Sequence, residues 1–263
     1  MCIIAVSKKG VKQPTLDQLR NMYTNNPHGA GFMYARKGVV HIEKGFMTWD
    51  SFINAVKLHN FTAEDAVVYH FRISTQAGVK PTMTHPFPLT TNMEYCEKTR
   101  CSASVGVAHN GIIRMTSDAK ETRFSDTVIF ITSYMTRLVR KKQDLTDVAV
   151  LNMIEHLTNS KWALMDGDGE IVTVGHFETV KGVMFSNDGY KKYRYVWNDD
   201  DDGFTDLGTG SIWTYDKTLG KYVKKNRPTQ PAPITSDYIP AKYRISSAVT
   251  EPAASMLDDF HAT

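Results

Sequence analysis

The feature that most constrains the fold is the run Cys2-Ile3-Ile4-Ala5-Val6, which is apolar at every position and is followed by the polar run Ser7-Lys8-Lys9-Gly10. A short apolar run bounded by polar residues and glycine is typical of a strand, and a strand that is apolar on both faces must be covered on both. We therefore expect residues 2–6 to form a central strand with other elements packed above and below it.

Strand and helix patterns follow one another in blocks up to about residue 190. Apolar spacing predicts helices at 15–23, 48–59, 128–138 and 148–157, and Thr15 with Gln18 suits a capping box. Strands are expected at 32–34, 39–43, 66–73, 105–110, 162–165, 171–174 and 183–186. Two successive helices between groups of strands favour an α+β fold of stacked layers over an alternating βαβ sheet.

The composition changes near residue 195. An unbroken acidic run occupies Asp199–Asp202, and a hairpin is expected at 211–223. Beyond it few large apolar residues remain, and this segment holds five of the ten prolines of the chain, Pro228, Pro231, Pro233, Pro240 and Pro252. We predict a globular body over 1–195 and an extension over 196–263, which consists of a short hairpin and a flexible, partly irregular tail.

Charge and cysteine content exclude several classes of protein. The formal net charge is +3, which is too small and too evenly mixed to indicate a nucleic-acid or anionic membrane partner. No segment is apolar for long enough to cross a bilayer, and the first five apolar residues are too few for a signal-peptide core. Three cysteines are an odd count that points to a reducing compartment. We expect a cytoplasmic protein.

Cys2 offers a specific chemistry if Met1 is removed, which its small side chain allows. Its thiol would then lie beside a free α-amine, whose ordinary pKa of roughly 7.7–8.0 lets it accept a proton near neutral pH. One residue would supply both nucleophile and base. The alternative is that Cys2 is a small hydrophobe in a buried strand, and its position alone favours that alternative.

Other segments change this balance. Taken with Cys2 and in chain order, five segments resemble the class II glutamine amidotransferase domain, a family of the N-terminal nucleophile hydrolases. These segments are Asn26–Gly31, His70–Thr75, Thr84–Phe87, Ala108–Gly111 and Ser125–Thr127. The resemblance covers roughly residues 2–190. It implies a four-layer αββα sandwich of the N-terminal nucleophile hydrolase type and an attack by Cys2 on the side-chain amide of glutamine.

The attack would place negative charge on the amide oxygen. The resemblance assigns Asn110 and the backbone N–H of Gly111 to hold that charge, and one such donor typically contributes about 2.7–4 kcal/mol to the transition state. Taken alone, the dipeptide Asn110-Gly111 fits a type I′ hairpin turn better. The γ-glutamyl thioester on Cys2 would then be hydrolysed by water, and no metal or organic cofactor is needed.

The two charged ends of glutamine have matching candidates. Arg72 suits the α-carboxylate and Asp126 suits the α-ammonium, although a surface arginine and a helix-capping aspartate are the structural alternatives. Thr75 is expected to hydrogen-bond near the substrate. His85, which precedes Pro86, matches a loop of the family and is expected to be structural rather than catalytic.

The loop before the second predicted strand matches the family in part. We expect Gly29 and Gly31 to let this loop pass close to Cys2. Many family members carry an acidic residue where this chain has His28, which changes the electrostatics of the loop more than the reaction.

Cys96 and Cys101 lie in a polar stretch and are expected to be free thiols in an insertion loop. A labile disulfide is the alternative. A zinc site would need two further ligands at recognisable spacing, and we predict no metal.

Three functions stay open at this point. The first is a glutaminase that feeds ammonia to a separate acceptor synthetase, because the residues beyond 195 are too few to be one. The second is a hydrolase of another γ-glutamyl amide that uses the same cysteine. The third is a non-catalytic interaction module that keeps the fold and Met1. A compact domain with a variable tail is similar to amidotransferases of bacteriophages, which would place it in the host cytoplasm.

Overall fold

In the computed structural model of the chain, the apolar N-terminal run forms β1 (Ile3–Ser7), and every residue of this strand is buried. β1 lies inside an antiparallel seven-stranded sheet with the order β10-β11-β1-β4-β2-β3-β6. Ile3 and Ala5 contribute to one apolar cluster, and Ile4 and Val6 contribute to another. The expectation of a central strand covered on both faces is therefore confirmed.

The structure describes residues 2–73, 78–114, 123–192, 195–198, 203–206, 211–216, 218 and 221–225. The chain divides into two compact units, residues 1–194 and residues 195–263.

Two antiparallel sheets make up the strands of the first unit. Besides β1, the seven-stranded sheet contains β2 (Ala30–Arg36), β3 (Val39–Phe46), β4 (Val67–Phe71), β6 (Arg100–Ala103), β10 (Glu178–Val180) and β11 (Val183–Phe185). The four-stranded sheet has the order β5-β7-β8-β9 and contains β5 (Phe87–Pro88), β7 (Val105–Asn110), β8 (Lys161–Asp166) and β9 (Ile171–Val174).

The helices lie where the apolar spacing predicts them. They are α1 (Leu16–Asn25), α2 (Trp49–His59), α3 (Asp126–Phe130), α4 (Thr136–Leu138) and α5 (Val148–Thr158). The expected capping box of Thr15 and Gln18 is present at the start of α1. The helix expected at 128–138 is interrupted by a π-helical turn, η4 (Ile131–Met135), between α3 and α4. Short 3₁₀ turns are η1 (Pro81–Met83), η2 (Tyr95–Glu97) and η5 (Lys142–Leu145).

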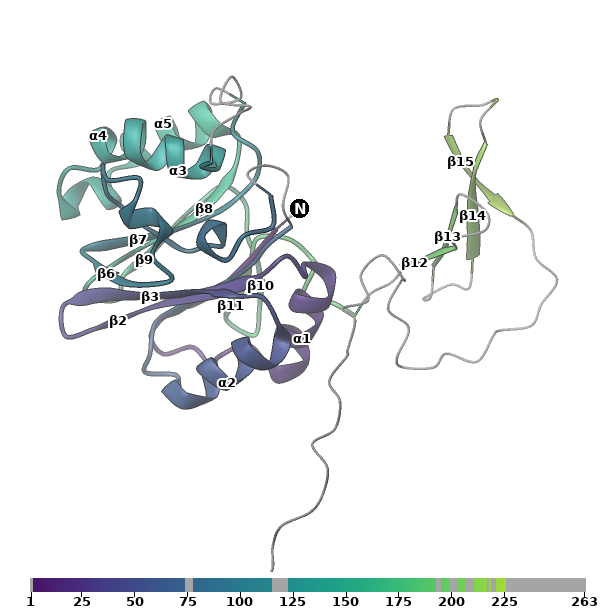
Figure 1. Cartoon of the computed structure of the whole chain (residues 1–263), viewed down its shortest axis with the longest axis horizontal. Coiled ribbons are helices and arrows are strands. Elements are labelled where there is room, and N and C mark those ends of the chain that lie inside the picture. The colour runs from purple at the N-terminus through teal and green to yellow at the C-terminus, as the bar shows by residue number, and fades with distance from the viewer. Residues whose placement is uncertain are drawn as a thin grey trace, which may run out of the picture. The chain divides into compact units, whose positions relative to one another are not determined.

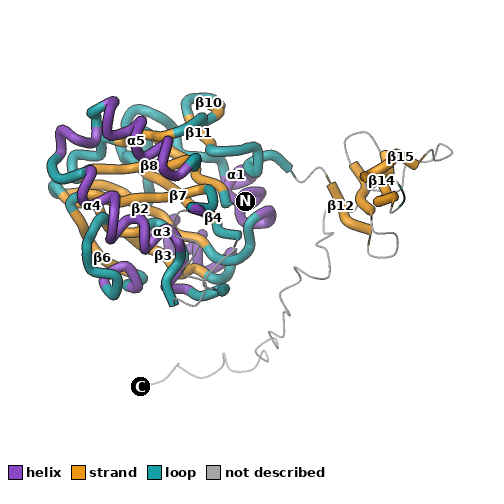
Figure 2. Tube along the Cα trace, turned by 90° about the horizontal axis from the view of Figure 1, so that it is seen from above, coloured by secondary structure: helices purple, strands orange, loops and turns teal. Residues whose placement is uncertain are grey.

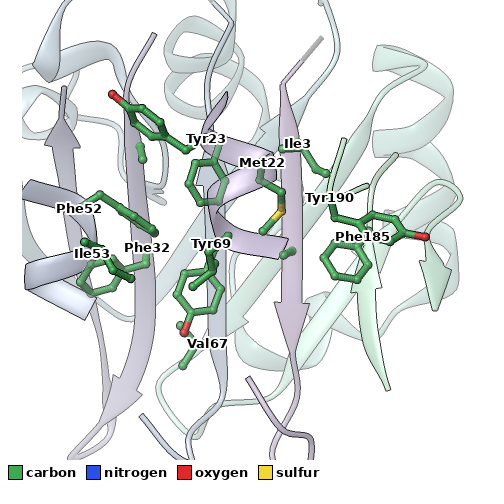
Figure 3. Close-up of a cluster of buried hydrophobic side chains, with 14 of the residues drawn as sticks. Ile3, Met22, Tyr23, Phe32, Phe52, Ile53, Val67, Tyr69, Phe185 and Tyr190 are labelled. Carbon is green, nitrogen blue, oxygen red and sulfur yellow. The ribbon is translucent and has the colours of Figure 1, made fainter. Parts of the chain in front are cut away.

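Three apolar clusters hold these elements together. The first joins α1 and α2 to one face of the seven-stranded sheet and includes Met22, Phe52 and Tyr69 (Figure 3). The second fills the space between the two sheets and includes Met33 and Ala163. The third joins the four-stranded sheet to α3, η4 and α5. It is centred on Trp162 and includes Val107, Phe130, Ile131, Ile154 and Leu164.

The figures show the same arrangement. α1 and α2 lie on the outer side of the seven-stranded sheet, and α3, α4 and α5 lie beyond the four-stranded sheet (Figure 1). Seen from above, α3, α4 and α5 lie over β7 and β8 (Figure 2). The fold class is therefore mixed α+β with antiparallel sheets, as the order of strands and helices predicts.

The stretch around the two later cysteines differs from the prediction. The expectation of an insertion loop is wrong, because Cys96 lies in η2 and Cys101 lies in β6, where it pairs with Ile42. The three cysteines are all free. Short edge strands carry few buried side chains, and β6 shows none of the apolar alternation that reveals the interior strands.

The second unit contains an antiparallel sheet of β12 (Tyr195–Asn198), β13 (Gly203–Asp206), β14 (Ser211–Asp216) and β15 (Lys221–Lys225). The hairpin expected at 211–223 corresponds to β14 and β15. β12 and β13 were not predicted, because the acidic run between them obscures the strand pattern on either side. That run and the proline-spaced segment from residue 226 lie outside the described residues. Within the described ranges, no helix is long and apolar enough to span a membrane.

Replacing Ile4 by Ala tests the double coverage of β1. Ile4 has no exposed surface and packs between the two sheets, so Ile4→Ala should lower the free energy of unfolding by about 2–4 kcal/mol. Leu58→Ala is the matched control, because Leu58 is 86% exposed and its loss should change stability by less than about 0.5 kcal/mol. Urea unfolding of both variants measures the difference, and equal stabilities would contradict the assigned position of β1.

Candidate active site

Three segments that are distant in sequence meet at one edge of the first unit. β1 and β4 are antiparallel and Ile3 pairs with Phe71, so the residue before β1 lies beside the residues that follow β4. The ring of His70 in β4 is 2.9 Å from the backbone oxygen of His109 in β7, which brings the end of β7 to the same edge. A cleft there is lined by Cys2, Arg72, Ile73, His85, His109, Gly111, Ser125, Asp126 and Thr127.

Cys2 is partly buried at this cleft rather than packed in the core. Its Sγ lies 3.4 Å from the backbone nitrogen of Ile73, which donates to it, and 3.5 Å from the carbonyl oxygen of the same residue. Burial raises the pKa of the Cys2 thiol, while the Ile73 backbone and the charge of Arg72 act in the opposite direction. The thiol is thus held in its neutral form in surroundings that already contain donors for a thiolate.

Arg72 and Asp126 are both buried and both line the cleft. Arg72 donates from Nη1 to the carbonyl oxygen of Gly78 at 2.7 Å. Burial lowers the pKa of Arg72, and the nearby Cys2 and Asp126 favour its charge. Arg72 is therefore not a surface arginine, and a positive and a negative group face the same small space.

Asp126 also has a structural role. Ser125 is the N-cap of α3, with its hydroxyl accepting from the Val128 N–H, so Asp126 is the first helical residue rather than the cap. Its Oδ2 accepts from the Ile113 N–H and its Oδ1 from the Thr127 N–H, both at 2.8 Å. Oδ1 also accepts from the Thr127 hydroxyl at 3.3 Å, so Oδ2 is the oxygen with a further lone pair that can accept from an ammonium group.

Asn110 and Gly111 do not form a hairpin turn. Asn110 is the last residue of β7, and the next strand with which β7 pairs, β8, begins only at Lys161, too far along the chain for a two-residue turn. Gly111 also has no positive φ, which a type I′ turn requires. A Cβ at Gly111 would come within 2.1 Å of the Ser160 hydroxyl, so only glycine fits here, with its backbone facing the cleft.

Two residues that the sequence analysis missed hold the segment that contains Cys2. Ser186 and Asn187 directly follow β11, the other neighbour of β1. Asn187 donates from Nδ2 to the Cys2 carbonyl oxygen at 2.7 Å. The Ser186 hydroxyl bonds to the Ile4 N–H and to the Asn110 side-chain amide, each at 2.9 Å. The signal that could have found them is a polar pair directly after a buried apolar strand.

Three buried histidines gather at the cleft, where His85 and His109 belong to its lining. The ring of His85 stacks on that of His70 with centroids 4.2 Å apart, and His109 lies 6.2 Å from His85. Burial lowers the pKa of His70 and of His109 to about 3, and it lowers the pKa of His85 well below its ordinary value. All three are neutral near pH 7, so His85 adds bulk and hydrogen-bonding capacity rather than charge.

The glycines of the preceding loop serve a different contact from the one expected. A Cβ at Gly31 would lie 2.2 Å from the His85 carbonyl oxygen, and a Cβ at Gly29 would lie 2.6 Å from the Thr84 side chain. The prediction that these glycines let the loop pass close to Cys2 is wrong. They let the loop and the start of β2 approach Thr84 and His85 closely, and neither glycine lines the cleft. Thr75 lies outside the described residues.

His28 lies in the same loop, directly before Gly29. Its N–H donates to the Arg72 carbonyl oxygen at 3.0 Å, and burial together with the charge of Arg72 lowers its pKa. The loop therefore contributes a neutral side chain beside Arg72 near pH 7.

Within the described part of the chain, no group of three or more His, Cys, Asp or Glu side chains is arranged to hold a metal ion. No protein-family model matches the chain, and a search of curated proteins finds no match.

Stability should fall on acidification because of the buried histidines. Their folded-state pKa values lie below the unfolded value of about 6.5, so below that pH the unfolded chain binds protons that the folded chain does not. The free energy of unfolding should decrease from about pH 6.5 towards pH 3. His70→Gln, which keeps a donor for the His109 carbonyl, should reduce the slope between pH 6 and 5 by about 1 kcal/mol per pH unit.

The control for this measurement is His156→Gln, at an exposed position of α5. It should leave the slope of unfolding free energy against pH unchanged. A His70→Gln slope equal to that of the unsubstituted chain would show that His70 is protonated in the folded state.

Proposed function

We propose that this chain is a glutamine amidotransferase of the class II type, which releases ammonia from the side-chain amide of glutamine through a γ-glutamyl thioester on Cys2. The observation that carries the proposal is the single cleft shared by Cys2, Arg72, Gly111 and Asp126. A nucleophile, an oxyanion donor and two opposite charges are the groups that an amino-acid amide requires. They come from four separate segments, so local sequence effects do not explain their convergence.

The packing of the first unit supports the proposal. Its three apolar clusters lie between helices and sheet, between the two sheets, and between sheet and helices. This order is the one expected of the four-layer αββα sandwich of N-terminal nucleophile hydrolases. In that fold the nucleophile begins a strand that is buried between layers, and Cys2 directly precedes β1.

The reaction begins with removal of Met1, which frees the α-amine of Cys2. This amine takes the proton of Sγ as the sulfur attacks the carboxamide carbon, because the buried thiol is not ionised on its own. The Gly111 N–H and the Asn110 amide hold the oxyanion. The C–N bond then breaks, the protonated amine returns its proton to the leaving ammonia, and the acyl group stays on sulfur. Water hydrolyses this thioester to glutamate.

Arg72 and Asp126 orient the substrate. The guanidinium binds the α-carboxylate and the Asp126 carboxylate accepts from the α-ammonium, which excludes amides that lack either group. Both side chains are buried, so the charges act in surroundings where electrostatic interactions are stronger than in water. We also propose that the protein acts in the cytoplasm and that a separate synthetase receives the ammonia.

Substitution of Cys2 tests the reaction. Cys2→Ala should lower ammonia release from glutamine by about 10³-fold or more, because the nucleophile is lost. Asn110→Ala should lower kcat by about 10²- to 10³-fold through the loss of one oxyanion donor. Cys101→Ala is the matched control and should retain activity. A coupled glutamate dehydrogenase assay measures the rates, and an active Cys2→Ala protein would refute the mechanism.

The amino terminus provides a second test. Intact-protein mass spectrometry should show the active protein without Met1. A variant with Lys inserted between Met1 and Cys2 should retain Met, fold normally by circular dichroism and release no ammonia, because the α-nitrogen of Cys2 is then an amide. Retained Met1 in a chain that hydrolyses glutamine would contradict the role of the amine. A chain that retains Met1 and has no activity on any γ-glutamyl amide would instead be an interaction module.

A further inference from the structure

We propose that Ser186 is a positioning residue that turns the side-chain amide of Asn110 so that its nitrogen, and not its oxygen, is presented to the reacting amide. This inference rests on the proposed function and adds to it a residue outside the cleft lining. No motif in the sequence identifies Ser186, and its hydrogen bonds to Ile4 and Asn110 are the observation that points to it.

Ser186 is held from both sheets of the first unit. Its N–H donates to the Ile4 carbonyl oxygen at 3.0 Å, and the Nζ of Lys161, from β8, donates to its carbonyl oxygen. The residue has 1% exposed surface. The hydroxyl is therefore fixed relative both to β1, which follows the nucleophile, and to the strand that pairs with Asn110.

The hydroxyl of Ser186 has one proton to donate and two lone pairs. The Ile4 N–H occupies one lone pair at 2.9 Å, and the nitrogen end of the Asn110 amide lies 2.9 Å from the same oxygen. In this orientation the Asn110 Oδ1 is buried and has no hydrogen-bond partner among the described residues. An unpaired buried acceptor beside a hydroxyl that can donate is an unfavourable arrangement.

A half-turn of the amide pairs the buried oxygen with a donor. The nitrogen and oxygen of an asparagine amide have nearly the same size, so their positions are exchanged without moving any neighbour. The Ser186 O–H then donates to Oδ1, and Ile4 keeps its bond. The two N–H groups of Asn110 move to the side away from Ser186. Gly111, the next residue, lines the cleft, and in the proposed mechanism its N–H and the Asn110 nitrogen donate to the oxyanion.

The geometry also links the donor to the nucleophile. Ile4 lies two residues after Cys2, and Asn187, next to Ser186, bonds to the Cys2 carbonyl at 2.7 Å. The segment after β11 thereby fixes both the attacking residue and the oxyanion donor. Because Ser186 does not touch the substrate, its loss should affect kcat much more than KM.

A double-mutant cycle tests this role in the full chain. Ser186→Ala should lower kcat about 10- to 100-fold while KM stays within about threefold, and it should have no further effect in an Asn110→Ala background. Ser7→Ala is the matched control. Ser7 is the last residue of β1 and is also buried, but its hydroxyl donates to the Lys12 carbonyl oxygen at 3.5 Å. An Ser186→Ala effect equal to that of Ser7→Ala, or one that persists fully without Asn110, would overturn the proposal.

Neutron diffraction from crystals of the unsubstituted chain gives a readout independent of activity. Deuterons on the Asn110 atom that points away from Ser186 would support the assigned orientation. Deuterons on the atom that faces Ser186 would overturn it, even if Ser186→Ala fails to fold. A chain that releases no ammonia would refute the proposed function, and the neutron map would still decide the orientation of the amide.

Discussion

The first unit depends on the coverage of β1 on both faces. Side chains of a strand alternate between its faces, so Ile3 and Ala5 pack toward the helices while Ile4 and Val6 pack toward the second sheet. A strand with one polar face could not connect these two cores. Burying such a strand requires a second sheet, and the outer face of that sheet requires the helices α3 and α5 to cover it.

The same strand places the candidate chemistry. Because β1 lies between β4 and β11, the residue that precedes it is next to the ends of both neighbours. One neighbour supplies Arg72 and the backbone of Ile73, and the other supplies Ser186 and Asn187. Cys2 is thus positioned by residues at strand ends, which are rigid, while its own side chain stays at the edge of the core.

Burial sets the charges at this edge. The three histidines at the cleft are neutral because a charge there would lose its hydration without a compensating partner. Arg72 keeps its charge because a guanidinium does not lose its proton near neutral pH, and the nearby Asp126 favours that charge. The cleft therefore presents one cationic and one anionic side chain among neutral histidines, which would suit the zwitterionic substrate of the proposed function.

The sequence by itself determined the central strand, the helices, the capping box of α1 and the interior strands, because each depends on local periodicity or on residue types near one another in the chain. It could not determine the edge strand β6, the glycine contact with His85, or the hydrogen bonds of Ser186. Those depend on which segments become neighbours after folding, as when Asn110 and Ser186, 76 residues apart, meet at 2.9 Å. The dipeptide Asn110-Gly111 by itself favours a type I′ turn, and tertiary packing decided instead that Asn110 ends β7, because β7 pairs with β5 and β8.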